Sequence, residues 1–173
     1  MDLGGTFGNT NALVLNNASS KLLFSNETTV GSVYTSLASS GIDVNESSTI
    51  TSLSVAHTTP VSIADGKILS GAITVSTGGS IKLGETGTLA STVLMSGGKL
   101  EADETLTLSG DLTQTGDMEI HVAQDKTLSY SGAAVNLGAR TLTMSGKGTF
   151  NNTNALRLNN ASSKLRLSNT STV

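Results

Sequence analysis

The sequence predicts an all-β chain that folds as a right-handed parallel β-solenoid, or β-helix, with short strands and about 20 residues per coil. The first observation is that pairs of apolar residues, separated by one residue, recur along the whole chain. The second is that turn-forming segments such as "SNET", "STGG" and "SGKG" stand between these pairs. The third is that no window shows the i, i+3, i+4, i+7 apolar spacing of a long amphipathic helix. We therefore expect residues 1–173 to form one continuous solenoid segment.

The apolar pairs predict the strands in their order along the chain, and the gaps between neighbouring pairs are often 8 to 10 residues. The expected strands contain Leu13/Leu15, Leu22/Phe24, Ile42/Val44, Leu53/Val55, Val61/Ile63, Ile73/Val75, Ile81/Leu83, Leu106/Leu108, Ile120/Val122, Leu142/Met144, Leu156/Leu158 and Leu165/Leu167. Two or three strands with their turns make one coil, so the chain is expected to form a rod roughly 40 Å long. Residues 31–50 are a candidate for an irregular excursion or a short helix, because "GSVYTSLASSGI" is the least regular stretch.

Composition favours the solenoid over two other folds with many short strands, the sandwich and the antiparallel barrel. Ser, Thr and Asn make up 63 of the 173 residues, and Trp is absent. Stacked coils suit this composition, because like residues form ladders and Asn side chains in turns hydrogen-bond to neighbouring backbone. Crossovers between parallel strands favour the right-handed form.

An internal repeat supports the same fold. The phrase "NTNALVLNNASSKL" at residue 9 returns as "NTNALRLNNASSKL" at residue 152. A shift of 143 residues superposes residues 5–30 on 148–173, and 20 of the 26 positions are identical. The shift also places Met1 on Met144, inside the segment "TLTMSGKGTF". We interpret the chain as one tandem unit of about seven coils and the opening of the next, cut from a longer protein.

Differences between the two copies predict which side chains face the core. Leucines on both sides of Val14 are retained while Val14 itself is replaced by arginine. Leu23 is also replaced by arginine, while Leu22 is retained and Phe24 becomes leucine. Neighbouring residues of a strand point to opposite faces, and a charge is tolerated only on the face in water. The predicted core-facing residues are Leu13, Leu15, Leu22, Phe24, Leu156, Leu158, Leu165 and Leu167. The predicted outward-facing residues are Val14, Leu23, Arg157 and Arg166.

Charge and composition exclude several classes of function. The formal net charge is −3 and no basic run occurs, whereas nucleic-acid binding requires a footprint of Lys and Arg. No stretch approaches the roughly 18 apolar residues of a membrane-spanning helix. Cysteine is absent, which excludes disulfides and thiolate metal sites. The opening "MDLGGTFG" lacks the charged start and apolar stretch of a signal peptide, so we expect any export signal to lie outside this segment.

Phrases such as "KTLSYSG", "RTLTMSGKGTF", "ETLTLSGDLTQTG" and "GSIKLGETGTL" resemble the passenger repeats of bacterial autotransporters and related large β-helical adhesins. The resemblance is one of style and is spread over about residues 50–173. It implies a right-handed parallel β-helix, export to the bacterial outer surface, and an adhesive or structural role. It implies no shared catalytic residues.

The residues that could bind a metal ion or take part in catalysis are few and scattered. His121 and Glu119 are expected on the outer face of one strand, but a metal site needs three or four converging ligands, and His57 stands apart. The segment "LEADETL" is the densest acidic group, with Glu101 and Asp103 expected on one face and Glu104 beside them. Such a group is more often a solvated edge than a catalytic pair. Calcium at turn carboxylates such as Asp103 or Asp117 is a further candidate.

Two polar patterns in the sequence are similar to glycosylation and ice-binding motifs, but neither predicts a functional site here. Asn-x-Ser/Thr triplets are glycosylation acceptors only in a glycosylating host, and here they follow from composition. They begin at Asn17, Asn26, Asn45, Asn151, Asn160 and Asn169. Thr-x-Thr occurs at residues 105–107 and 141–143, but its uneven spacing argues against an ice-binding array.

The sequence therefore predicts a non-enzymatic structural segment of a long secreted or cell-surface fibre or adhesin, acting as stalk, shaft or filament body. No cofactor or metal is expected. The expected partners are neighbouring repeats or other copies of the chain joined head to tail, with the C-terminal end accepting a coil like residues 31–60, and host or surface glycans are a further candidate. The alternative is a carbohydrate-binding or carbohydrate-cleaving β-helix with carboxylates and aromatic rings in one groove. A trimeric fibre of interwoven chains is disfavoured because heptads are absent.

Overall fold

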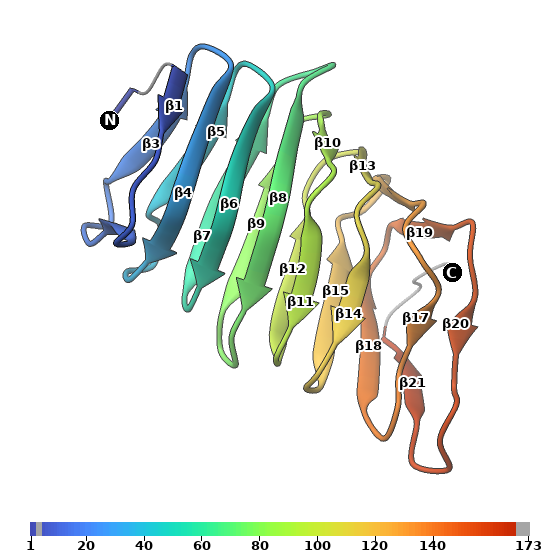
Figure 1. Ribbon diagram of the computed structural model, residues 1–173. Helices are drawn as coiled ribbons and strands as arrows, with labels where there is room; N and C mark the ends of the chain where they lie inside the picture. Colours follow the sequence, from blue (N-terminus) through green and yellow to red (C-terminus); the bar gives the residue numbers. More distant parts are fainter. Residues whose placement is uncertain (3–4, 169–173) are drawn as a thin grey trace.

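The computed structural model describes residues 1–2 and 5–168, which form a stack of parallel coils (Figure 1). The larger sheet has 11 strands: β1 (Gly5–Phe7), β2 (Leu13–Leu15), β4 (Thr28–Thr35), β6 (Ser48–Val55), β8 (Ile68–Val75), β10 (Thr88–Leu89), β11 (Thr92–Met95), β13 (Leu106–Leu108), β14 (Leu112–Gln114), β16 (Thr127–Tyr130) and β19 (Thr149–Asn152). The other main sheet has eight strands: β3 (Lys21–Phe24), β5 (Gly41–Val44), β7 (Thr58–Ile63), β9 (Ser80–Gly84), β12 (Gly98–Ala102), β15 (Met118–Val122), β18 (Thr141–Gly146) and β21 (Lys164–Leu167). A small third sheet pairs β17 (Val135–Asn136) with β20 (Leu156–Arg157).

Each coil contributes one strand to the eight-stranded sheet, so the described chain makes about eight turns of a β-solenoid. The pairing is parallel, and register partners lie between 19 residues apart, as for Ile42 and Val61, and 24 apart, as for Val122 and Gly146. The predicted coil of about 20 residues is therefore confirmed. In Figure 1 the front strands β4, β6 and β8 run downward while the stack advances to the right, which is right-handed winding.

Alternation along the strands builds the core between the two main sheets. In β15, for example, Met118, Ile120 and Val122 are buried, and the two residues between them face outward. Register places Ile120 between Leu100 of the preceding coil and Met144 of the following one. Inward side chains thus stack in continuous columns along the axis, and each coil is held by its two neighbours.

A glycine accommodates the tightest approach between two coils. Strands β6 and β8 pair with a register shift between Ile50 and Leu53, because two residues of β6 lie opposite one of β8. Gly71 faces Ile50 at this bulge with a φ of +121°, and a Cβ there would lie 1.8 Å from the Ile50 carbonyl oxygen. Only a residue without a side chain fits this position.

The structure contradicts the prediction of an irregular excursion or helix at residues 31–50. This segment completes β4, forms β5 and enters β6, and all three strands pair in register with coils on either side. The apparent irregularity arises because inward positions of this coil hold small polar residues. Thr35 is buried and accepts a hydrogen bond from the Thr59 hydroxyl at 2.8 Å, while buried Ser40 donates to the carbonyl of Asn17 at 3.0 Å.

The predicted inward and outward residues follow the alternation, but they differ in burial between the two copies. Leu15, Leu22 and Phe24 are buried, Leu13, Leu156 and Leu165 pack partly against the core, and Val14, Arg157 and Arg166 are exposed, with Leu23 half-buried. Leu158 and Leu167, which the sequence predicts to face the core, are 54% and 57% exposed. Leu167 lies beside buried Met144 in the register, but no described coil covers its other side.

Candidate functional site

The outer face of the eight-stranded sheet carries the densest group of interacting polar side chains. Parallel register produces two adjacent columns on β12, β15 and β18, because equivalent residues of successive coils lie side by side. One column contains Glu101, His121 and Ser145, and the other contains Lys99, Glu119 and Thr143. We call these residues, with Ser80 of β9, the outer polar network.

Contacts in the outer polar network run from coil to coil. The Lys99 ammonium lies 3.7 Å from Glu101 Oε1 and 3.6 Å from Glu119 Oε1. The Ser80 hydroxyl donates to Glu101 Oε1 at 2.7 Å. One lysine therefore contacts both carboxylates, and Glu101 also accepts a hydrogen bond from a serine, so side chains link neighbouring strands.

Ser145 brings the second half of the network together. Its hydroxyl donates to Glu119 Oε1 at 2.5 Å, and its oxygen lies 2.9 Å from His121 Nδ1. In a nucleophilic triad the carboxylate orients the histidine, and the histidine removes the serine proton. Here the serine lies between the other two groups, and its hydroxyl donates its hydrogen bond to the carboxylate. The arrangement therefore suits a structural link between coils and not nucleophilic catalysis.

Four ion pairs outside the network also join consecutive coils. The pairs are Lys21–Asp43 at 2.7 Å, Lys67–Glu46 at 2.7 Å, Lys82–Asp103 at 2.9 Å and Lys126–Glu104 at 2.5 Å. The hydrogen bond from Lys82 to Asp103, with the charge of that carboxylate, raises the pKa of Lys82. Because these side chains are partly exposed, each pair contributes only about 0–1 kcal/mol to stability.

The predicted acidic group at "LEADETL" is thus divided among three different lysines. Glu101 contacts Lys99, Asp103 pairs with Lys82, and Glu104 pairs with Lys126. Asp103 and Glu104 also line an open hollow of about 450 Å³ together with Asp65 and Glu85. Within the described ranges 1–2 and 5–168, no three His, Cys, Asp or Glu side chains gather closely enough to hold a metal ion.

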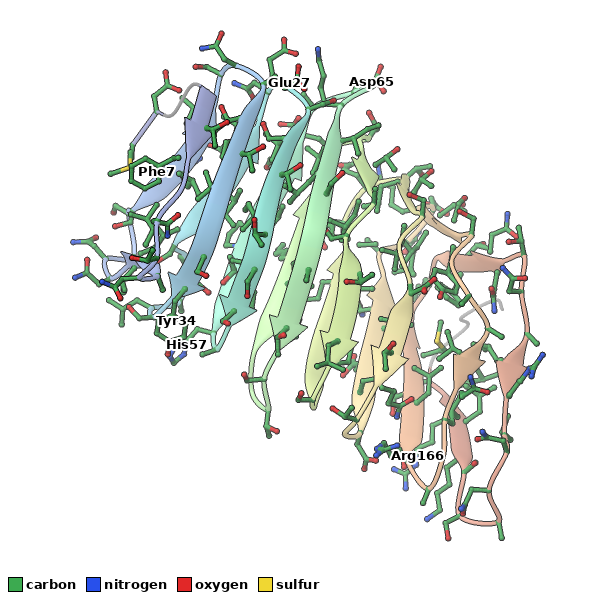
Figure 2. The ribbon with its side chains drawn as sticks, viewed as in Figure 1. Phe7, Glu27, Tyr34, His57, Asp65 and Arg166 are labelled. Atoms are coloured by element: carbon green, nitrogen blue, oxygen red, sulfur yellow. The ribbon has the colours of Figure 1, made fainter. Side chains whose placement is uncertain are left out.

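The two histidines lie in different surroundings. His121 shares the outer face of β15 with Glu119, as predicted, and both are half-buried. His57 is exposed in the turn between β6 and β7, at the end of the strands where Tyr34 also lies (Figure 2). The two histidines are therefore not parts of one site.

The ends of the stack expose apolar side chains that are buried elsewhere. Phe7 in the first coil is 42% exposed, whereas its repeat equivalent Phe150, which stacks on Tyr130, is 1% exposed. Figure 2 shows Phe7 at one end of the molecule and Arg166 near the other. Leu158 and Leu167 in the last described coil are also exposed, so both end coils present apolar side chains to solvent.

The Tyr130 hydroxyl makes hydrogen bonds inside the stack that the sequence did not predict. Tyr130 is fully buried and stacks on Phe150 with ring centroids 6.0 Å apart. Its hydroxyl donates to the Ala133 carbonyl at 2.6 Å and accepts from the Leu112 amide at 3.1 Å. Burial raises the pKa of Tyr130, the Leu112 hydrogen bond lowers it, and the charge of Asp111 raises it, with burial the largest effect.

We expect Tyr130→Phe to lower the free energy of unfolding by about 2 kcal/mol, because it leaves the buried Leu112 amide without a partner and removes the hydrogen bond to the Ala133 carbonyl. The raised pKa keeps the folded tyrosine protonated when the unfolded one ionises. Wild-type stability should therefore be complete at neutral pH and fall as pH rises above about 10. Urea unfolding between neutral and alkaline pH measures both effects. The alkaline loss should be smaller in Tyr130→Phe, and Tyr34→Phe, on a half-buried outward residue, is the control.

Comparison with protein-family models, with curated proteins and with solved structures finds no match for this chain. In the part of the chain that the structure describes, no helix is long and apolar enough to cross a bilayer. The assignment to the β-solenoid class accordingly rests on strand pairing and register alone.

Proposed function

We propose that this chain is a structural segment of a longer secreted or cell-surface fibre or adhesin, and that it serves as stalk or shaft without catalytic activity. The observation that carries the proposal is the combination of a continuous core with two apolar end coils related by the 143-residue repeat. A coil stack with such ends extends by adding further coils. The style of its repeats, which resembles autotransporter passengers, supports export to the bacterial outer surface.

The side-chain contacts of the outer face also support a structural role. The polar groups of this face bind one another across coils, as the shared contacts of Lys99 with Glu101 and Glu119 illustrate. Such pairs help to hold neighbouring coils together. A rod that must stay extended benefits from this effect.

The carbohydrate alternative has less support. It requires carboxylates and aromatic rings in one groove, but Phe24, Tyr130 and Phe150 are buried in the core. Phe7 and Tyr34 belong to the larger sheet, away from the outer polar network on the eight-stranded sheet. The described surface therefore brings no ring beside the carboxylates that a sugar-binding groove would need.

Surface labelling of intact cells tests the proposal. We expect an antibody against the chain to label the outside of the cells that produce it, and external protease to remove the label. An antibody against a cytoplasmic protein is the control for cell integrity. Labelling that appears only after the cells are opened would contradict the surface role.

A further inference from the structure

The Asn-x-Ser/Thr triplets of the sequence have different surroundings in the folded chain. A glycosylating enzyme requires an exposed asparagine amide and a serine or threonine two residues later. Within the described residues the triplets begin at Asn17, Asn26, Asn45, Asn151 and Asn160, and all five asparagines are exposed. The triplet at Asn169 lies outside these residues. Composition explains how often the triplet occurs, whereas the folded structure decides which of its hydroxyl groups an enzyme can reach.

In three of the triplets the hydroxyl already bonds to the backbone. The Thr28 hydroxyl donates to the Asn26 carbonyl at 2.8 Å, the Ser47 hydroxyl accepts from the Ile68 amide at 3.1 Å, and the Thr153 hydroxyl donates to the Tyr130 carbonyl at 3.2 Å. Thr28 is also buried, and Ser47 is half-buried. An enzyme would have to disrupt these contacts before it could bind the triplets that begin at Asn26, Asn45 and Asn151.

The other two triplets lie in exposed turns and have free acceptor groups. Asn17 lies between β2 and β3, and Asn160 lies between β20 and β21. In each turn the asparagine side-chain oxygen accepts a hydrogen bond at 2.9 Å from the backbone amide two residues later, that of Ser19 or Ser162. The asparagine Nδ2 and the serine hydroxyl make no hydrogen bond within the described residues, and both serines are exposed. The groups that a glycosylating enzyme must contact are therefore accessible without any unfolding.

These two turns are equivalent turns in the two copies of the repeat. The shift of 143 residues superposes them, and the segment "NNASSKL" is identical in both. The turn at Asn17 contacts the coil that follows it, because the Ser40 hydroxyl donates to the Asn17 carbonyl at 3.0 Å. The turn at Asn160 contacts the coil that precedes it, because the Ser163 hydroxyl donates to the Gly138 carbonyl. The asparagine stays exposed beside either neighbour, so its exposure is a property of the turn and not of the end of the stack.

We propose that Asn17 and Asn160 are N-glycosylation sites of the folded chain, and that the other three described triplets are not. The co-substrate is a hexose activated as a sugar diphosphate. The asparagine Nδ2 attacks the anomeric carbon of the sugar and forms a carbon–nitrogen bond. The bond from that carbon to the diphosphate oxygen breaks, the diphosphate leaves, and a base of the enzyme takes the Nδ2 proton.

The turns can carry a sugar without a change in the fold. The hydrogen bond to the backbone amide is made by the asparagine oxygen, so it remains when the nitrogen is modified. The turn between β20 and β21 projects at the lower edge of the stack, away from the core (Figure 1). A bulky, solubilising sugar would therefore stand at equivalent corners of the rod, one in each copy of the repeat. This inference goes beyond the proposed structural role, because it assigns a covalent modification to the surface of the rod.

Incubation of the folded full chain with a soluble asparagine glucosyltransferase and a nucleoside-diphosphate glucose tests the selectivity. Peptide mass spectrometry should find one added glucose at Asn17 and one at Asn160, and none at the other described triplets. Unfolded peptides that carry those other triplets are the control, and the same enzyme should modify them. Ser19→Ala should abolish modification at Asn17 alone, and Ser19→Thr should retain it. Circular dichroism verifies that each variant is folded.

Mass spectrometry of the chain isolated from the cells that produce it tests the modification itself. We expect the peptides that contain Asn17 and Asn160 to carry a hexose on the asparagine. The proposal is overturned if the isolated chain carries no sugar at these two residues, or if the enzyme modifies all triplets of the folded chain equally. A chain that is labelled on cell surfaces but carries no sugar would refute the glycosylation sites alone. A glycosylated chain that is confined to the cytoplasm would refute the surface role alone.

Discussion

Gly71→Ala is expected to lower the free energy of unfolding by roughly 3–5 kcal/mol. The added Cβ would lie 1.8 Å from the carbonyl oxygen of Ile50, which is backbone of the preceding coil and cannot rotate away. The φ of +121° adds a conformational cost of about 1–3 kcal/mol for a residue with a side chain. The coils on both sides of the bulge must separate to relieve the contact. Urea unfolding followed by circular dichroism measures the loss.

Gly78→Ala is the matched control for this substitution. Gly78 also has a positive φ, +80°, but a Cβ there would meet no atom within 4 Å. Its expected cost is about 1 kcal/mol, the conformational part alone. The difference between the two variants therefore isolates the steric approach of coils at the bulge. Equal losses for both would show that the stack relaxes around Ile50 and would contradict a close fit at this point.

Leu22→Arg is expected to detach the N-terminal coil, at a cost of about 3–5 kcal/mol for an unpaired charge in the core. Leu22 is fully buried and lies beside Ile42. Because a solenoid is stabilised by contacts between neighbouring coils, the damage should stay near this end. Hydrogen exchange should show lost protection at residues 5–25, with residues 80–122 still protected.

Leu23→Arg changes the adjacent residue by the same chemistry and should alter stability by less than about 0.5 kcal/mol. Leu23 faces outward beside Asp43, and its repeat equivalent is Arg166. The charge of the new arginine lies on the outward face beside a carboxylate, so it is not removed from water. If the two variants were equally damaging, the assignment of inward and outward faces from the repeat would be wrong.

The sequence predicts the architecture because alternation and repetition are local properties. Apolar pairs and turn residues within ten positions of each other are enough to indicate short strands, and the substitution of Val14 by Arg157 in the repeat indicates the side that faces water. The prediction for residues 31–50 is wrong for a related reason. The inward polar residues of this segment, such as Thr35 and Ser40, satisfy their hydrogen bonds through other coils, and no local pattern indicates those partners.

The outer polar network could not be predicted, because its contacts depend on coil length. His121 meets Ser145 across 24 residues and Lys99 meets Glu119 across 20, and no single period links both pairs. The same applies to Tyr130, whose hydroxyl accepts a hydrogen bond from the amide of Leu112 in the preceding coil. A fixed repeat of about 20 residues would misplace several of these partners by one or more positions.

The sequence by itself therefore determined the strand class, the approximate coil length, the sidedness of each strand and the relation between the two ends. Tertiary structure alone decided which residues of neighbouring coils meet, where a bulge at Gly71 absorbs the unequal coil lengths, and which repeated leucines remain exposed. The physical reason is that sidedness depends on each residue's immediate neighbours in the chain. Register between coils, in contrast, is the sum of every turn that separates them.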